Sequence, residues 1–418
     1  MIRAAAFLAA AVSSGALAQP APADIPGERL AVYLVSFGPG PLLWERFGHN
    51  AIWIRDTLTG QGPAYDYGRF TFEQEHFLLN FARGHMQYGM GRAEGVALLN
   101  RYLRGERSVT LQELNLPPEA RTALWEFLEA DIEDDGGTYR YDYYRDNCST
   151  RVRDAIDMVA GGVIRATLDT IPSGRTYRFH TRRSLQNNPA WYFGVTASLG
   201  PATDRPISAW EEAFLPLELR DHIRQVVLPG PDGVPVPLVR GEVQVSDPGV
   251  HSVPDQPVNW TLGFLAAGLL LGTGMAGLGS LARRGRAWRI AFLLVDGSWA
   301  LVAAIAGVIL VFFWGLSDHA VAYRNQNLWQ LNLLSLALLP LIAPVSRGEP
   351  SVRRAATALA GLLAGAALIG LLLKGLPGFG QANGDILALT LPAQLGLAAG
   401  IWLAVRPRAP SSGLPSPR

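Results

Sequence analysis

The chain has 418 residues, of which 49% are apolar and only 17% are charged, and its formal net charge is +1. Soluble domains average about 25% charged residues, and the shortfall is local, because only 13 charged residues fall between Val258 and Val405. The composition excludes a single soluble globule and indicates a soluble part followed by a membrane part. Near-neutral charge gives no support to nucleic-acid binding, and a single cysteine excludes an intramolecular disulfide framework.

The N-terminus has the pattern of a secretory signal peptide. Arg3 precedes an apolar run from Ala4 to Ala11, and Ala16-Leu17-Ala18 forms a small-residue cleavage site. We therefore expect residues 1–18 to be a signal peptide. An uncleaved membrane anchor is the alternative, and both versions export the segment that follows.

The exported segment, about 24–233, alternates strand patterns with helical ones. Its apolar runs and turn residues predict strands at 30–37, 50–55 and 64–70, and helices at 72–82, 92–103, 118–132 and 149–159. This mixture predicts an α+β domain. Residues 234–258 are rich in proline and have little periodicity, so they are predicted to be a linker.

Five apolar stretches follow within a predicted membrane domain, 259–405, at about 260–282, 290–315, 328–345, 355–373 and 386–405. Each is long enough to span a bilayer, and only Asp296 places a charge inside one. Arginines gather on every second loop, at 283–289, at 347–354 and after the fifth stretch. The positive-inside rule then predicts a bacterial inner-membrane protein with its soluble domain outside and residues 406–418 as a cytoplasmic tail.

Cys148 follows a polar, aromatic-rich segment and starts a predicted helix. A thiol at a helix N-terminus lies at the positive end of the helix dipole, which favours the nucleophilic thiolate, and Arg145 and Arg151 add positive charge nearby. Most lone cysteines are small buried hydrophobic residues, which is the structural alternative. An unpaired thiol is less easily tolerated in an oxidising compartment, so Cys148 is the candidate nucleophile.

A thiolate nucleophile needs a base, and His49 is the best-placed histidine because it follows Gly48 at the start of a predicted strand. A histidine with a purely structural role is the alternative. Asp66, on the next predicted strand, is the candidate to orient the imidazole. The other candidates for that role are Asp142, Asp146 and Asn147. The histidines lack ligand spacing, so we expect neither a metal nor another cofactor.

Four segments together carry a family resemblance: FGHNAIWI (47–54), AYDYGRF (64–70), FARGHMQYGM (81–90) and YRYDYYRDNCSTRVRDAID (139–157). They resemble the exported domain of the Lnb-type lipoprotein N-acyltransferases. The resemblance implies a permuted papain-like fold of the NlpC and lecithin–retinol acyltransferase kind, in which the histidine precedes the cysteine. It also implies an α-helical membrane domain behind it, here with five transmembrane helices.

The resemblance implies thioester chemistry on lipids. Cys148 would take an acyl chain from a diacylglyceryl lipoprotein, or from a membrane phospholipid, and pass it to the N-terminal amine of a lipoprotein, giving the lyso-form. The residues predicted to contact substrate are Tyr144, Asn147 and Arg151, which flank Cys148, and His319 and Asn325, in the polar loop between the second and third stretches.

Two other functions are compatible with the same residues. A membrane-tethered cysteine peptidase or amidase would act on cell-wall peptides and would be indifferent to lipoprotein lipids. A non-catalytic membrane assembly protein with a degenerate papain fold would not need the thiol of Cys148.

Overall fold

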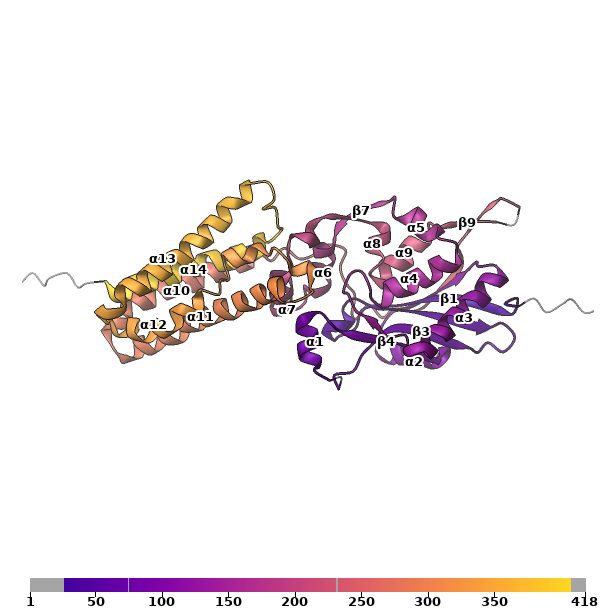
Figure 1. The fold of residues 1–418 in the computed structure, drawn as a ribbon, viewed down its shortest axis with the longest axis horizontal. Coiled ribbons are helices and arrows are strands. Elements are labelled where there is room, and N and C mark those ends of the chain that lie inside the picture. The colour runs from indigo at the N-terminus through magenta and orange to yellow at the C-terminus, as the bar shows by residue number, and fades with distance from the viewer. Residues whose placement is uncertain (1–25, 74, 231, 407–418) are drawn as a thin grey trace, which may run out of the picture.

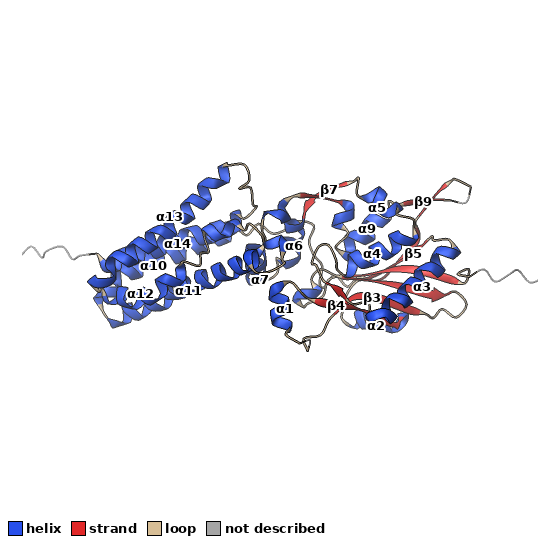
Figure 2. Ribbon diagram, in the orientation of Figure 1, coloured by secondary structure: helices blue, strands red, loops and turns tan. Residues whose placement is uncertain are grey.

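The structure is a computed structural model that describes residues 26–73, 75–230 and 232–406. The predicted signal peptide, and the predicted tail beyond Arg406, lie outside the described residues. The molecule is elongated, with a mixed domain at one end and a bundle of long helices at the other (Figure 1). Figure 2 shows that every described strand belongs to the mixed domain.

The mixed domain is built on a seven-stranded antiparallel sheet. In hydrogen-bonded order its strands are β11 (Val239–Ser246), β5 (Val109–Leu114), β1 (Leu30–Phe37), β2 (His49–Asp56), β3 (Pro63–Arg69), β4 (Gln87–Glu94) and β6 (Tyr139–Arg140). β1 pairs with β2 over its whole length, from Leu30 opposite Asp56 to Phe37 opposite His49. The three predicted strands are therefore confirmed as neighbours in the centre of one sheet.

Helices cover both faces of this sheet. Val32 and Ile52 pack on one face against α3 (Pro118–Asp135), α4 (Cys148–Val159) and α9 (Pro216–Ile223). Val35 and Trp53 pack on the other face against α2 (Gly95–Arg104). Because alternate side chains of a strand point to opposite faces, β1 and β2 are apolar on both sides.

The remaining elements of the mixed domain lie around this core. They are α1 (Phe77–Arg83), α5 (Val163–Leu168), α6 (Tyr177–Leu185), α7 (Pro189–Ser198) and α8 (Ala209–Glu212), with the two-stranded pairs β7 (Pro172–Thr176) with β8 (Pro206–Ser208) and β9 (Val227–Pro229) with β10 (Pro235–Pro237).

Three sequence predictions differ from this structure. The helix predicted over 72–82 is α1, which begins only at Phe77. The helix predicted over 92–103 begins only at Gly95, because Glu94 caps it by accepting the Ala97 N–H, and the residues before it form β4. The predicted linker, 234–258, contains β10 and the edge strand β11. β11 belongs to the sheet because it pairs antiparallel with β5, and Glu242 and Gln244 also accept hydrogen bonds from the side chains of Gln112 and Thr110.

Four helices of the bundle are long and apolar enough to cross a membrane: α10 (Thr261–Leu281), α11 (Arg286–Gly315), α13 (Arg353–Leu372) and α14 (Gly384–Val405). The stretch predicted to span at 328–345 holds only α12 (Ser335–Arg347), whose 13 residues reach about 20 Å, against about 30 Å of hydrocarbon. The segment before α12 is not helical throughout because polar side chains hold it in place. Gln330, for example, donates to Ala367 O at 2.9 Å.

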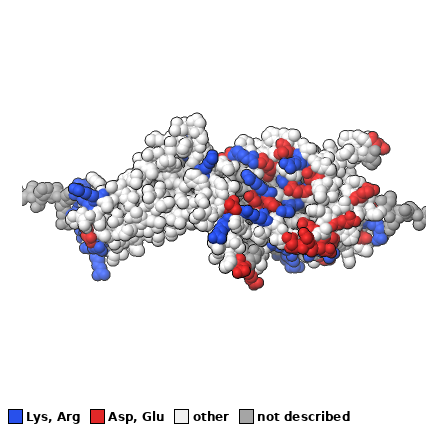
Figure 3. Space-filling view, in the orientation of Figure 1, with Lys and Arg blue, Asp and Glu red and all other residues white. Residues whose placement is uncertain are grey.

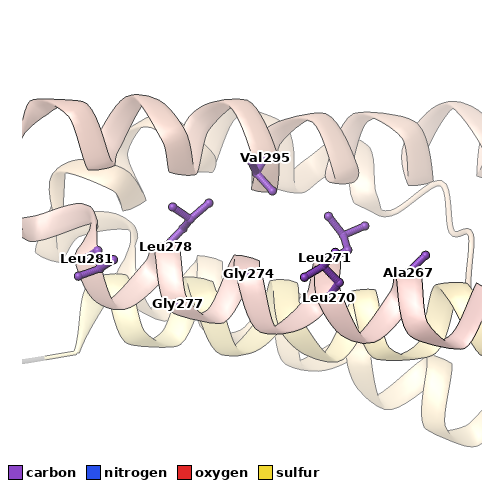
Figure 4. A pocket seen from close by; sticks show the side chains of 8 residues that line it. All are labelled: Ala267, Leu270, Leu271, Gly274, Gly277, Leu278, Leu281 and Val295. Carbon is purple, nitrogen blue, oxygen red and sulfur yellow. The ribbon is translucent and has the colours of Figure 1, made fainter.

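Glycines let α10 and α14 pack backbone against backbone. A Cβ atom on Gly279 would lie 2.0 Å from Gly400 O, and one on Gly272 would lie 2.3 Å from Pro392 O. Another face of α10 borders an apolar groove of about 570 Å³ toward Val295 of α11 (Figure 4). Gly274 and Gly277, which line this groove, have open space beside them.

The mixed domain is fastened to the helix bundle by buried polar contacts. Asp385, in the first turn of α14, accepts hydrogen bonds from Arg182 of α6 and Tyr192 of α7, each at 2.8 Å. Asn325 and Asn327, which follow α11, both donate to Ala197 O at 2.8 Å. These contacts fix the position of the mixed domain over one end of the bundle.

On the face seen in Figure 3, the charged side chains of the bundle lie at its ends and its middle is bare of them. Basic side chains gather at the end far from the mixed domain, where the loops that follow α10 and α12 meet the end of α14. Arg283 donates to Arg406 O there, and Gly348 lies beside the Arg283 side chain. The arginines that predicted the topology are therefore together at one end of the bundle.

Candidate active site

Cys148 is the first residue of α4, and Asn147 caps that helix. Asn147 Oδ1 accepts the N–H of Ser149 at 2.8 Å and that of Thr150 at 3.0 Å. The cap therefore stops the helix immediately before the cysteine and satisfies two of its free amides. The N–H of Cys148, as the first helical amide, has no partner inside the helix. Asn147, predicted to bind substrate, is buried and serves as this cap.

The start of α4 is fixed to the strand that carries the histidine. Asn50 Nδ2 of β2 donates to Ser149 Oγ at 3.0 Å, and Ser149 Oγ donates to Ala213 O at 2.8 Å. All three groups are buried. Because Asn50 is next to His49 and Ser149 is next to Cys148, this chain of hydrogen bonds sets the position of the thiol relative to the imidazole.

His49 and Asp66 lie within hydrogen-bonding distance of each other. His49 Nε2 and Asp66 Oδ2 are 3.1 Å apart, and Arg69 Nε donates to Asp66 Oδ1 at 2.8 Å. β2 and β3 pair with Trp53 opposite Ala64. His49 is four residues from Trp53 and Asp66 is two residues from Ala64, so both side chains emerge on the same face. Of the four acidic or amide residues considered from the sequence, Asp66 is the one that the structure pairs with His49.

A bulge in β3 brings Arg69 to Asp66. In a regular strand, residues three apart point to opposite faces. The pairing with β4 shifts register between Tyr67 and Arg69, which turns Arg69 toward the face of Asp66. The bulge contains Gly68, whose φ is +96°. A Cβ atom on Gly68 would lie 3.2 Å from Cys148 Cβ, so the missing side chain also makes room for the cysteine.

His49 is held as a cation by its surroundings. Burial lowers its pKa, but the charges of Tyr102 and Cys148 and hydrogen bonds with Asp66 and Cys148 outweigh burial, and the net pKa lies well above the ordinary value. Burial raises the pKa of Asp66, but the hydrogen bond and charge of His49 and the charge of Arg69 bring it below its ordinary value. The site therefore favours a carboxylate beside an imidazolium.

Aromatic rings enclose the thiol and the imidazole. The His49 ring stacks on Tyr102 at 5.8 Å and on Phe37 at 6.2 Å. On the side of the sulfur, burial and then the charge of Cys148 raise the pKa of Tyr88 to about 12, and the same two causes raise the pKa of Tyr141. These phenols therefore stay protonated, and their rings, 4.2 Å apart and stacked, form an apolar wall beside Cys148.

Two other predicted substrate residues are committed to structural contacts. Tyr144 is buried, its hydroxyl lies 2.7 Å from Thr181 Oγ1, and its ring packs on Tyr177. Arg151 forms a two-pronged ion pair with Asp146 and stacks over the ring of Tyr139 at 4.4 Å. It lines a cavity of about 310 Å³ that Cys148 and His49 do not line.

His319 and Asn325 lie where the mixed domain meets the bundle. His319 Nε2 donates to Phe81 O at 2.8 Å, and its ring lies 5.9 Å from that of Tyr143. Tyr143 is next to Tyr141, with ring centroids 5.7 Å apart. His319 is therefore connected to the aromatic wall beside Cys148. Asn325 is only 2% exposed and belongs to the polar junction described above.

Sequence reasoning missed Gly68, Arg69, Gly91 and Tyr102. A glycine inside a strand pattern signals a bulge, and AYDYGRF contains one, so Gly68 and Arg69 had a signal. Gly91 had none, because its role is to leave space for the side chain of Arg69: a Cβ there would lie 1.6 Å from Arg69 Nε. Tyr102 looks in the sequence like an ordinary residue of a helix.

One group within the described residues has the spacing of a metal site. Glu212, Glu218 and His222 place ligand atoms within 4.8 Å of one another. Arg183 pairs with Glu218, and His180 Nε2 lies 2.7 Å from Glu212 Oε1. These partners already satisfy the carboxylates, so the group is accounted for as a buried ion-pair network.

The fold and site define a membrane protein whose α/β domain presents a cysteine, a histidine and an aspartate at the edge of a helix bundle. Residues 19–188 match the family model of the Lnb N-terminal periplasmic domain, and residues 266–372 match that of the Lnb transmembrane domain. The two matches together cover more than half of the chain, so the protein belongs to the Lnb family. Its N-terminal domain is periplasmic, and the predicted resemblance is confirmed. No curated protein and no solved structure matches the chain.

Proposed function

We propose that this protein is a thiol acyltransferase that moves an acyl chain of a bacterial lipoprotein through a Cys148 thioester to an N-terminal amine. One observation carries the proposal: Cys148, at the start of α4, is fixed beside β2 by the Asn50–Ser149 hydrogen bond, and the His49 imidazole of that strand is paired with Asp66. That arrangement provides a nucleophile, a proton carrier and a group that orients the carrier. Family membership supports an enzyme of the lipoprotein N-acyltransferase kind.

In the first step, the Cys148 thiolate attacks the ester carbonyl of the donor. A carbon–sulfur bond forms, the carbon–oxygen bond to glycerol breaks, and the His49 imidazolium gives its proton to the leaving oxygen. The negative charge that develops on the carbonyl oxygen accepts a hydrogen bond from the free N–H of Cys148, at the positive end of α4.

In the second step, the amine of the acceptor attacks the thioester. A carbon–nitrogen bond forms, the carbon–sulfur bond breaks, and neutral His49 takes the proton that the amine loses. The thiolate and the imidazolium are restored together. The net change converts an ester and an amine into an alcohol and an amide, and it needs no cofactor.

The surroundings of the site favour a lipid over a cell-wall peptide. The rings of Tyr88 and Tyr141 beside Cys148 continue through Tyr143 to His319, which follows α11 closely. An apolar wall that leads from the bilayer end of the bundle to the thiol suits an acyl chain. A peptide substrate would instead require polar groups placed to hold its backbone.

We further propose five membrane passes, with α12 as the short fifth pass, and a cytoplasmic C-terminus. The arginines at the far end of the bundle support this orientation. We also propose that the periplasmic domain is a permuted papain-like fold, because the strand of His49 precedes the helix of Cys148 and packs against it.

The test uses the full-length protein in lipid nanodiscs with a synthetic diacylglyceryl lipopeptide. Mass spectrometry is expected to find one acyl chain on the N-terminal amine, one fewer on the glycerol, and a hydroxylamine-sensitive acyl group on Cys148. Cys148→Ala is expected to abolish the transfer of the acyl chain and the formation of the acylated protein. An unchanged diacylglyceryl lipopeptide with a free amine would overturn the proposal, and release of peptides from cell-wall fragments would favour the amidase alternative.

A further inference from the structure

Helix α1 exposes an unusual amount of apolar surface. Leu78 is 80% exposed, and Leu79, Phe81 and Phe72 are exposed as well. Trp44 extends this surface, since its ring contacts that of Phe72 at 6.1 Å. We call these five residues the apolar patch. A contiguous patch of this kind on a soluble face marks a contact surface.

The place of α1 is set by the membrane domain. Two carbonyls in its last turn accept hydrogen bonds from the loop that follows α11. Asp318 N donates to Arg83 O at 2.8 Å, and His319 Nε2 donates to Phe81 O at 2.8 Å. Asp318 also accepts a hydrogen bond from Arg140 Nη2 at 2.7 Å. Only two residues separate Asp318 from Gly315, the last residue of α11.

The direction of α1 suits a bilayer surface. Figure 1 shows α1 beside the outer ends of the long helices, with its axis lying across them rather than along them. A helix that lies in the membrane plane and carries a one-sided apolar face is the arrangement by which proteins rest on the lipid interface. Trp314 and Leu316, at the end of α11, are also exposed and apolar at this level.

From this placement we infer that α1 lies in the outer leaflet of the membrane and that the apolar patch contacts lipid acyl chains. The occupant is the bilayer because the patch reaches the end of a membrane helix: the Phe81 ring lies 6.3 Å from that of His319, which lies 5.2 Å from the ring of Phe313 in α11. Between Phe72 and α1, the exposed carboxylates of Glu73 and Glu75 face water.

The patch also leads toward the thiol. The Phe77 ring lies 6.3 Å from that of Phe70, and Phe70 lies 4.9 Å from Tyr88, which borders Cys148. An acyl chain that leaves the bilayer at α1 would follow these rings to the sulfur. This last step rests on the proposed function, whereas the lipid contact of α1 does not.

The test measures depth in the membrane with a nitroxide label. Leu78→Cys is labelled in full-length Cys148→Ala protein, which has no other thiol, and reconstituted in phosphatidylglycerol–phosphatidylethanolamine nanodiscs. The matched control is Leu58→Cys, which is 74% exposed in the turn after β2. That turn lies at the opposite end of β2 from His49. A second label, at Leu79→Cys, guards against a local disturbance at Leu78.

Leu78 and Leu79 labels are expected to show a severalfold higher ratio of oxygen to nickel-chelate accessibility than the Leu58 label. Equal ratios at all three positions would overturn the inference. A change at Leu78 only after a second protein is added, with none caused by the bilayer, would overturn it too. Because these proteins lack the thiol, the measurement reads lipid contact whether or not acyl transfer takes place.

Discussion

Asp66 of β3 and Gly91 of β4 face each other across the sheet, and the side chain of Arg69 lies over Gly91 to reach the Asp66 carboxylate. The orientation of His49 therefore depends on a residue with no side chain on a neighbouring strand. Any side chain at Gly91 occupies the space that the guanidinium needs.

Gly91→Ala is expected to slow formation of the Cys148 thioester. The new methyl displaces Arg69, and Asp66 loses a charged hydrogen bond, worth about 1.5–3 kcal/mol, so the rate falls by about tenfold or more. The measurement is the single-turnover rate of acylation. Gly89→Ala, two residues away, is the control, since its Cβ meets only Gly136 O at 3.2 Å. Equal losses in both variants would contradict the role of Arg69.

The pH dependence of the acylation rate is expected to follow the protonation of His49. Its pKa is raised, so the imidazolium persists through neutral pH and the rate falls only as alkaline pH removes that proton. Asp66→Asn takes away a hydrogen-bonding carboxylate that raises the pKa, so the alkaline limb of the rate profile moves to lower pH. A limb at the same pH in both proteins would assign it to another group.

The same two shifts have opposite consequences for stability. The pairing of His49 stabilises the fold fully below about pH 6.5, the unfolded pKa, and is lost as pH rises through the raised folded value. The pairing of Asp66 is fully present above about pH 3.9 and is lost as pH falls through its lowered folded value. The double variant His49→Gln, Asp66→Asn lacks both pairings. The pH dependence that they give to the unfolding temperature is therefore expected to disappear in this variant.

Gly68→Ala is expected to impair catalysis more than its backbone strain alone would explain. The variant strains a residue with φ of +96° and pushes a methyl to 3.2 Å from Cys148 Cβ, so the thiol shifts away from His49. Gly174→Ala separates the two effects, because Gly174 has φ of +72° and nothing within 4 Å of an added Cβ. Both variants should lose about 1–3 kcal/mol of stability, and only Gly68→Ala should lose most of its acylation rate.

The stability of the membrane domain is expected to depend on Gly279 of α10 and not on Gly277. Gly279→Ala forces α10 and α14 apart, whereas Gly277→Ala adds a methyl to the open groove shown in Figure 4. In detergent, Gly279→Ala should lower the unfolding temperature by several degrees, an overpacking cost of about 1–3 kcal/mol. Gly277→Ala should leave it unchanged. A similar loss in both would show that the close contact of Gly279 with α14 does not control stability here.

The centre of the periplasmic sheet could be predicted because its residues carry a strong local signal. Leu30–Phe37 is a β-rich apolar run buried on both faces, and Gly48 marks the start of β2. Neighbouring antiparallel strands then bring His49 and Asp66 together, as the structure shows. The start of α4 at Cys148 was foreseeable within one residue, because Asn147 is a preferred N-cap residue.

The remainder depended on tertiary contacts. β4 has few β-branched residues, and the sheet edge, rather than its own sequence, makes it a strand. The third apolar stretch directly follows Asn325 and Asn327, whose side chains donate to Ala197 O of the periplasmic domain, and hydropathy does not detect such contacts. The predicted substrate residues near Cys148 in sequence instead make structural contacts. Tyr144 bonds to Thr181 in the core, Asn147 caps α4, and Arg151 pairs with Asp146.

The contacts of Asp385 in α14 with Arg182 and Tyr192 determine how far the periplasmic domain stands from the bilayer. A domain on a flexible linker would adopt many heights above the bilayer. Here these contacts, together with the Val258 N–H that donates to Gln186 Oε1 at 2.7 Å, hold the periplasmic domain firmly against the bundle. Cys148 is therefore held at one height above the lipid. If Cys148 transfers acyl chains, its fixed height above the bilayer determines which ester bond it can reach, before any head group is recognised.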